Sequence, residues 1–240
     1  MRRDRNETGL IIDDRNLREQ YGMPYQEAQS RKNMIVFSGC KIPLKDKGID
    51  VSFLPPKTKY YFNIQNLGGI HNEIKLVVIE EAPRMRTIRV DKERNYYLSF
   101  PYIEYIYMSY HNEPFLFVYF RNNPIENLDD MLFEAMLYNV FGFGDDVCFG
   151  DITIDNRIMS FKQETQAWIE AFWTSEFQKD AINSYIDFEK WEKESQKDKS
   201  FILHKSWQEV GTIKERIISI VSYVCHVAID RESVIFRIQD

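Results

Sequence analysis

Three short runs of aromatic and β-branched residues in the middle of the chain constrain its fold more than any other feature. They are residues 87–90, 102–107 and 115–120, and the last two lie a hairpin's length apart. Residues of these types favour strands, and the His-Asn-Glu-Pro segment at 111–114 supplies a turn between the second and third runs. The sequence therefore predicts an antiparallel meander over about residues 85–121.

A helical pattern follows this meander. Positions i, i+1, i+4 and i+7 of one segment carry a stripe that would lie along one side of an α-helix: Trp168, Ile169, Phe172 and Ser175. The spacing predicts a helix over residues 163–177 that packs across the sheet and places the stripe in the core. Among the neighbouring aromatic residues, Trp173 is the one expected to depart from a core position.

Shorter patterns predict the remaining elements. Apolar runs bounded by breakers indicate strands at residues 34–37, 51–54, 76–79 and 233–238, with a turn at 66–69. An amphipathic helix is expected over residues 206–221, with Ser206 as its N-cap. The charged residues 189–199 are expected to lie in solvent. Together these elements give an α+β fold class.

Length and composition favour a folded protein with one main domain. The 240 residues are enough to bury a sizeable core, and an aromatic content of 15% argues against disorder. Residues 1–33 are mostly charged and polar, which indicates a loosely held arm or one short helix around residues 16–29. The predicted organisation is an N-terminal arm over 1–33 and a single α+β domain over 34–240.

Hydropathy and charge disfavour two classes of partner. No apolar run approaches the ~18 residues of a membrane span, so no membrane association is expected. The start of the chain has basic residues without an apolar stretch behind them, which favours a cytoplasmic protein. The formal charge of −6 disfavours binding to nucleic acid, and only the local group Arg84, Arg86 and Arg89 supports that alternative.

The cysteine pattern is not that of a disulfide framework or a zinc site. Cys40, Cys148 and Cys225 are few, odd in number and far apart, which fits a reducing compartment. Only Cys225 and His226 stand side by side, and a structural zinc site needs three or four protein ligands. Neighbouring residues also point in different directions on a strand or a helix, so packing is the expected role of this pair.

The strongest functional pattern is an ordered series around Cys148. Asn139-Val140 is followed by a Gly/Asp turn and by Val-Cys-x-Gly at residues 147–150, and Trp-x-x-x-Phe-x-x-Ser-x-Phe then begins at Trp168. This series resembles protein B of the PRTRC plasmid and phage gene cassette, a family of prokaryotic relatives of ubiquitin-conjugating enzymes. Pro83 and Arg86 also resemble an upstream Pro-x-x-Arg pattern of that family.

The resemblance implies a fold and a pair of site residues. The fold would be the ubiquitin-conjugating-like one, an antiparallel meander sheet packed against helices, with its core at about residues 85–180. Cys148 would stand for the thioester cysteine and Asn139 for the asparagine of the His-Pro-Asn motif. The sequence departs from that motif, because Leu137 and Tyr138 replace His-Pro and the stretch from asparagine to cysteine is one residue longer.

Transthiolation explains why these residue types would be needed. The reaction requires an accessible thiolate nucleophile and a donor, such as an asparagine amide, aimed at the oxyanion that forms when an amine attacks the thioester. Asp145, Asp146 and Asp151 could orient or deprotonate an incoming lysine. Nearby carboxylates also tend to raise a thiol pKa, which would make Cys148 less reactive.

Two functional interpretations follow from the resemblance. In the first, the chain is a conjugating transferase of a phage or plasmid system. It would carry a ubiquitin-like modifier as a thioester on Cys148, received from an adenylating activating enzyme, and would need no cofactor or metal. In the second, the chain is a non-catalytic adaptor or assembly protein that retains the fold, and Cys148 is an inert core thiol.

Overall fold

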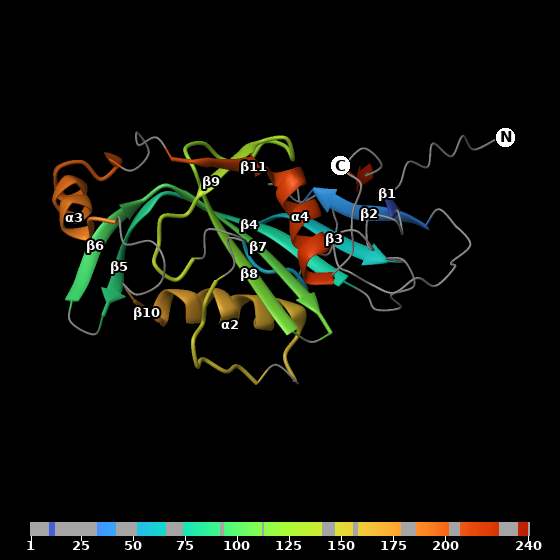
Figure 1. The fold of residues 1–240 in the computed structure, drawn as a ribbon, viewed down its shortest axis with the longest axis horizontal. Helices are drawn as coiled ribbons and strands as arrows, with labels where there is room; N and C mark the ends of the chain where they lie inside the picture. The colour runs from blue at the N-terminus through green and yellow to red at the C-terminus, as the bar shows by residue number, and fades with distance from the viewer. Residues whose placement is uncertain are drawn as a thin grey trace, which may run out of the picture.

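Two β-sheets and three α-helices make up the part of the chain that the computed structural model describes (Figure 1). The described residues are 10–12, 33–41, 52–65, 74–91, 94–111, 113–140, 147–155, 158–178, 186–201, 207–225 and 235–239. Strands and helices occupy largely separate parts of this chain, so the predicted α+β class is confirmed.

The larger sheet has nine strands in the order β1-β2-β3-β4-β7-β8-β9-β11, and β12 joins it at β2. All neighbours in this order are antiparallel, and β12 runs parallel to β2. The strands are β1 Leu10–Ile12, β2 Asn33–Lys41, β3 Thr58–Gln65, β4 Ile74–Glu81, β7 Tyr102–Tyr110, β8 Glu113–Arg121, β9 Met131–Glu134, β11 Glu209–Thr212 and β12 Ile235–Gln239.

The smaller sheet extends one hairpin of the larger sheet. Its order is β10-β5-β6, with β5 at Arg84–Val90, β6 at Arg94–Phe100 and β10 at Glu176–Phe177. β4 pairs with β7, and β5 pairs with β6. The two pairings share one unbroken register, from Lys75 opposite Ser109 to Val90 opposite Arg94. Pro83 and Pro101 divide this long hairpin, because proline has no N–H to give to a ladder. The antiparallel meander is therefore confirmed, although β6 was not predicted as a strand.

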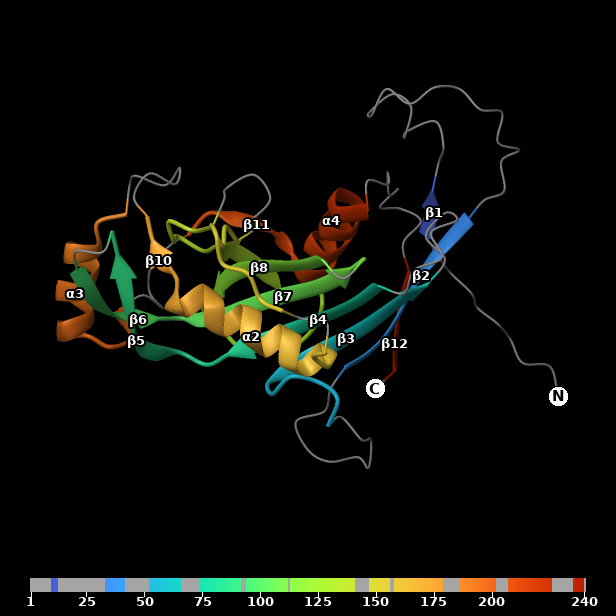
Figure 2. The same cartoon turned by 90° about the horizontal axis from the view of Figure 1, so that it is seen from below.

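Helix α2, Phe161–Thr174, lies on one face of the larger sheet (Figure 2). Ser160 caps its first turn, because the Ser160 side chain accepts from the Gln163 N–H while the Gln163 side chain accepts from the Ser160 N–H. Trp168 and Phe172 are buried as predicted. The predicted end was wrong: the helix stops before Ser175, and Phe177 belongs to β10.

Helix α4, Ile213–Cys225, packs on the opposite face of the sheet. Its predicted start at residue 206 was wrong, because residues 209–212 form β11; Ser206 itself lies outside the described residues. The helix begins where Thr212 and Glu215 exchange hydrogen bonds, each side chain accepting from the backbone N–H of the other. Gly211, with φ at +115°, lies at an irregularity in the pairing of β11 with β9, two residues before the helix starts.

Helix α3, Phe188–Lys197, was not predicted, since its sequence is dominated by charge. Asp187 caps it, and Phe188, Trp191 and Ser195 form its buried stripe. The helix covers the edge of β6: Glu192 accepts from the Tyr97 N–H and Ser195 from the Ser99 N–H. Side chains of α3 thus occupy an edge that another strand could otherwise pair with.

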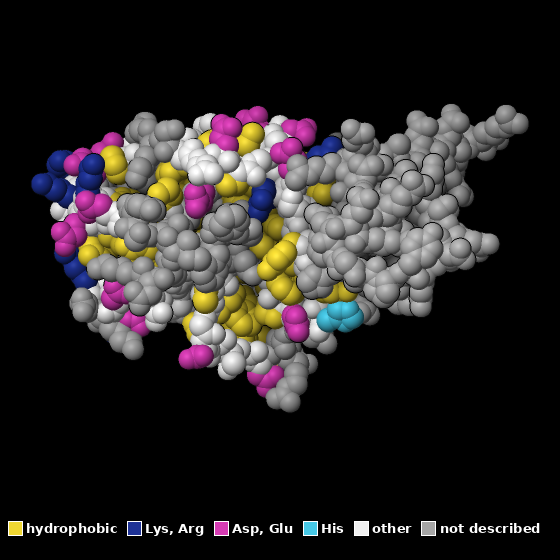
Figure 3. Space-filling model, in the orientation of Figure 1, with side chains coloured by type: hydrophobic (Ala, Val, Ile, Leu, Met, Phe, Trp, Pro, Cys, Tyr) yellow, Lys and Arg dark blue, Asp and Glu magenta, His cyan; other side chains and the backbone are white. Residues whose placement is uncertain are grey.

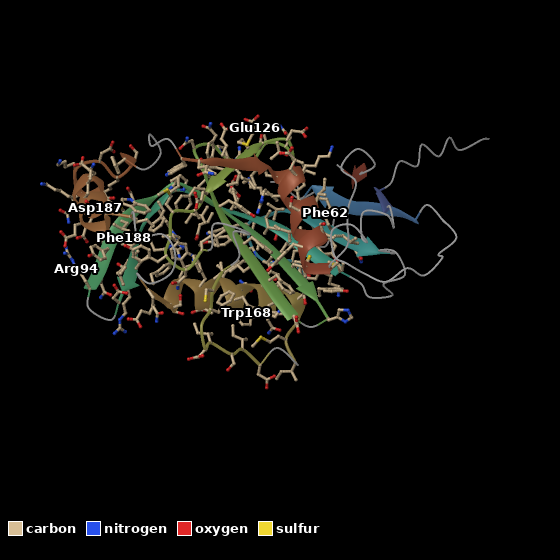
Figure 4. All side chains as sticks on the ribbon, viewed as in Figure 1. Phe62, Arg94, Glu126, Trp168, Asp187 and Phe188 are labelled. Carbon is tan, nitrogen blue, oxygen red and sulfur yellow. The ribbon has the colours of Figure 1, made fainter. Side chains whose placement is uncertain are left out.

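β5, β6 and α3 lie together at one end of the molecule in both ribbon views (Figures 1 and 2). Below, the arm means these three elements and not the predicted N-terminal arm. Arg94, Asp187 and Phe188 lie together near its tip (Figure 4). Arg94 pairs with Glu189 at 2.9 Å and with Glu192 at 3.0 Å. Charged side chains of both signs gather on this end of the surface (Figure 3), so the tip is solvated.

The other strand predictions had mixed outcomes. Strands predicted at 34–37 and 76–79 are confirmed as parts of β2 and β4, and the strand predicted at 233–238 is confirmed from residue 235 onward as β12, residues 233 and 234 lying outside the described parts. The strand predicted at 51–54 was wrong, because residues 52–54 form a turn ahead of β3, which was missed. The predicted turn at 66–69 and the helix around 16–29 lie outside the described residues. The boundary at residue 33 remains a prediction. No described helix is both long and apolar enough for a membrane span.

Candidate functional site

Asn139 and Cys148 are held together by backbone hydrogen bonds. The Cys148 N–H donates to the Asn139 carbonyl at 2.8 Å, and Val140 and Val147 form an antiparallel bridge. The Val147 N–H donates to the Leu116 carbonyl of β8 at 3.0 Å, which ties the cysteine segment to the sheet. The two residues singled out from the sequence thus lie next to each other in space.

Gly150 turns the chain just after the cysteine. Its φ of +58° lies in the left-handed region, which side chains disfavour, and a Cβ built there would meet nothing within 4 Å. The glycine is therefore required by backbone conformation and not by crowding. Gly142 and Gly144, the other glycines of the motif, lie outside the described residues.

A pocket of about 310 Å³ opens beside the Cys148 thiol. We call it the thiol pocket. Three segments line it, from the turn at 138–139, the turn at 148–152 and the end of α2 with β10: Asn139, Cys148, Phe149, Gly150, Asp151, Ile152, Ser175, Glu176 and Gln178. Cys148 is half-buried. Phe149 packs against α2, with its ring centroid 4.5 Å from that of Trp168.

The carboxamide of Asn139 is bound to the segment that follows α2. Its Nδ2 donates to Ser175 Oγ at 3.1 Å and to the Glu176 carbonyl at 3.0 Å, and its Oδ1 accepts from the Gln178 N–H at 3.3 Å. Both amide hydrogens are therefore engaged within the protein. Asn139 fixes residues 175–178 against the cysteine segment in this arrangement.

Carboxylates lie on the walls of the thiol pocket. Asp151, suggested by the sequence, lines it, whereas Asp145 and Asp146 lie outside the described residues. Glu176 was missed by sequence reasoning, although it directly follows the Ser of the Trp-x-x-x-Phe-x-x-Ser pattern. Its Oε1 is buried and has no hydrogen-bond partner among the described residues.

The other cysteines differ in their surroundings. Cys225, at the end of α4, is buried, and this burial raises the pKa of its thiol to about 12. Cys40 lies in β2, where only the backbone is described, and His226 lies outside the described residues. No group of three or more His, Cys, Asp or Glu side chains in the described parts of the chain could hold a metal ion.

Comparison with known proteins gives a family. The sequence pattern of prokaryotic E2 family D, E2 being the usual name for ubiquitin-conjugating enzymes, matches residues 70–208, more than half of the chain. No match was found among curated proteins or solved structures. The predicted relation to ubiquitin-conjugating enzymes is confirmed at this level, and membership of the PRTRC subgroup stays a prediction. The chain belongs to prokaryotic E2 family D.

Proposed function

We propose that this protein carries a ubiquitin-like modifier as a thioester on Cys148, as part of a phage or plasmid conjugation system. The observation that supports the proposal is the placement of a half-buried thiol and Asn139 in one pocket of a prokaryotic E2 fold. The thiol must stay reduced, which is consistent with a cytoplasmic protein. Its partners would be the modifier and an adenylating activating enzyme.

The reaction consists of two exchanges at the thiol pocket. Cys148 Sγ attacks the thioester carbonyl of the activated modifier, and the thiol of the activating enzyme leaves with the proton that Cys148 loses. An amine of the target then attacks the new thioester, and Cys148 leaves as a thiolate. Asp151 or Glu176 could accept the proton that the amine gives up, since both line the pocket.

Asn139 would act as the oxyanion donor only after a local rearrangement. Its two amide hydrogens are bound to Ser175 and Glu176, so at least one of these bonds must open before the amide can turn toward the thioester. Catalytic hydrogen bonds often form only in the reacting complex, and the geometry is consistent with that sequence of events.

A non-catalytic adaptor is the second candidate, and the residues before Asn139 favour it. Leu137 and Tyr138 are buried where the His-Pro pair would stand. The Tyr138 ring packs at 4.9 Å against that of Phe188, and its hydroxyl donates to the Ile186 carbonyl. These positions stabilise the contact between the cysteine segment and the arm.

A reconstituted charging reaction tests the proposal. The protein, its cognate activating enzyme, the modifier and ATP should give an adduct that a reducing thiol removes. Cys148→Ala should abolish the adduct, and Cys148→Ser should give at most a thiol-resistant ester. Cys225→Ala is the matched control and should charge like the wild type. Full activity of Cys148→Ala with the cognate components would exclude the catalytic function.

A further inference from the structure

A buried carboxylate binds several cations at the point where the long hairpin is divided. Glu81 is the last residue of β4, and it pairs with Arg84 at 2.6 Å, with Lys57 at 3.2 Å and with Arg86. Arg84 and Arg86 belong to β5, on the far side of Pro83. The ion pairs therefore connect the two halves of the hairpin where a proline cannot donate to the ladder.

The same carboxylate is linked to the end of α2. Tyr105 donates its hydroxyl hydrogen to Glu81 at 3.0 Å and accepts from Trp173 Nε1 at 2.6 Å. The Arg86 guanidinium lies 3.7 Å from the centre of the Trp173 ring, in cation–π contact. We call Glu81, Arg86, Tyr105 and Trp173 the Glu81 cluster.

The charge of Glu81 is maintained by its partners. Burial alone would raise the pKa of Glu81, but Arg86, Lys57 and the Tyr105 hydroxyl outweigh it, so the pKa is lowered. Burial, followed by the negative charge of Glu81, raises the pKa of Tyr105 well above its usual range. The carboxylate and the phenol thus keep the protonation states that their hydrogen bond requires across the neutral range.

The Glu81 cluster lies next to the residues that build the thiol pocket. Trp173 is followed after one residue by Ser175 and Glu176, which accept the two hydrogen bonds of Asn139. Glu176 also starts β10, which pairs with Arg89 of β5 in the arm. The wall of the pocket opposite Cys148 therefore depends on α2 at one end and on the arm at the other.

We propose that Glu81 is a positioning residue for the thiol pocket. Its carboxylate fixes β5 relative to β4, and through Tyr105, Arg86 and Trp173 it fixes the segment that carries Ser175 and Glu176 beside Cys148. This role rests on the proposed function, since it concerns the same pocket. The effect of Glu81 on the position of Ser175 and Glu176 is nevertheless expected whether or not Cys148 carries a modifier.

Alkylation of the intact protein by iodoacetamide, followed by peptide mass spectrometry, tests the role of Glu81. Glu81→Gln should speed labelling of Cys148 by about threefold or more, because a loosened wall opens the pocket to the reagent. Glu81→Asp keeps the charge and should return the rate toward the wild-type value. Glu189→Gln, which removes an exposed partner of Arg94, is the matched control and should leave the rate unchanged.

Cys225 serves as an internal reference in each sample, because it lies in the core on the other face of the sheet. If Glu81→Gln fails to fold, Tyr105→Phe decides, since it removes only the hydroxyl that joins Glu81 to Trp173. An unchanged Cys148 rate in the folded variant would overturn the proposal. So would parallel acceleration at Cys225, which indicates general destabilisation, or an equal effect of Glu189→Gln. The labelling assay uses no modifier, so its result can be interpreted even if the charging reaction fails.

Discussion

Cys148 and Cys225 are associated with opposite faces of one sheet, and the two faces are built differently. The face under α4 is largely aliphatic, and the helix contributes mainly isoleucine and valine: Ile213, Ile217, Ile218, Ile220, Val221 and Val224. The face under α2 is rich in aromatic side chains, and several of them carry a hydrogen-bonding group. Cys225 is buried in the first, whereas Cys148 borders a pocket at the edge of the second.

The difference shows what a site needs beyond a core. Aliphatic packing is not directional, so the α4 face can bury a thiol but gives little to orient a ligand. The α2 face contains directional contacts, such as Trp173 to Tyr105 and Asn139 to Ser175, which fix side chains in one arrangement. A pocket of defined shape is therefore expected on the α2 face.

Core truncation should give the largest effect and should act on both faces. Phe172→Ala and Ile217→Ala each remove a fully buried side chain and should lower the free energy of unfolding by about 3–5 kcal/mol. Only Phe172→Ala should also speed labelling of Cys148 in the folded state, because Phe172 packs against Phe177 of β10. Urea unfolding measures the first effect, with exposed Lys190→Ala as control. Variants within about 1 kcal/mol of wild type would show that the faces are not core.

The next largest effect should be the difference in labelling rate between Cys148 and Cys225, the cysteines of the two faces. Iodoacetamide at neutral pH should modify Cys148 at least about 100-fold faster than Cys225, because reaction requires an accessible thiolate. The Cys225 pKa of about 12 leaves almost none of that thiol ionised. Peptide mapping over time gives both rates from one sample. Comparable rates in the folded protein would contradict the comparison between the two faces.

Much of the fold could be predicted because its signals are local. The aromatic and β-branched runs of β7 and β8 and the apolar stripe of α2 are visible within short windows. β6 was missed although Tyr96, Leu98 and Phe100 alternate and are buried, because the charged residues at its start concealed the pattern. In α3 the many charged residues of both signs concealed a narrow buried stripe, in which Phe188 and Trp191 are the large side chains.

Some residues of the candidate site could also be predicted from the sequence, and others could not. Cys148 and Asn139 could be selected from the sequence because a family pattern marks them, and the structure places both in one pocket. Ser175, Glu176 and Gln178 could not be selected, because they reach the pocket only when β10 pairs with β5. That pairing joins residues far apart in sequence, and no local pattern encodes it.

A buried acid on the α4 face offers a smaller effect with a clear sign. Glu104 is fully buried, both of its oxygens lack hydrogen-bond partners among the described residues, and Arg121 is 3.9 Å away. Burial, followed by the charge of Glu80, raises the pKa of Glu104 well above its usual range. The folded state therefore holds a proton that the unfolded state releases, so stability falls as pH rises from the unfolded pKa toward the folded one.

Glu104→Gln should remove this dependence. The variant should be about 1–2 kcal/mol more stable than wild type at pH 8, because the neutral amide avoids the cost of ionising a buried acid, and the advantage should shrink toward pH 4. Melts across that pH range measure it, with exposed Glu113→Gln as control. A variant less stable than wild type at pH 8 would mean that the contact with Arg121 outweighs burial.

The smallest effect should come from removing one directional contact of the α2 face, the hydrogen bond between Asn139 and Ser175. Ser175→Ala removes a hydroxyl that accepts from Asn139 and donates to the Phe172 carbonyl, and it should lower the free energy of unfolding by about 1 kcal/mol, the low end of the net value of two hydrogen bonds. It also frees one amide hydrogen beside Cys148, so labelling of that thiol should change while labelling of Cys225 stays constant. Thr174→Ala, one residue earlier and exposed, is the matched control. If both variants leave Cys148 labelling at the wild-type rate, the Asn139–Ser175 contact stabilises the fold without shaping the pocket.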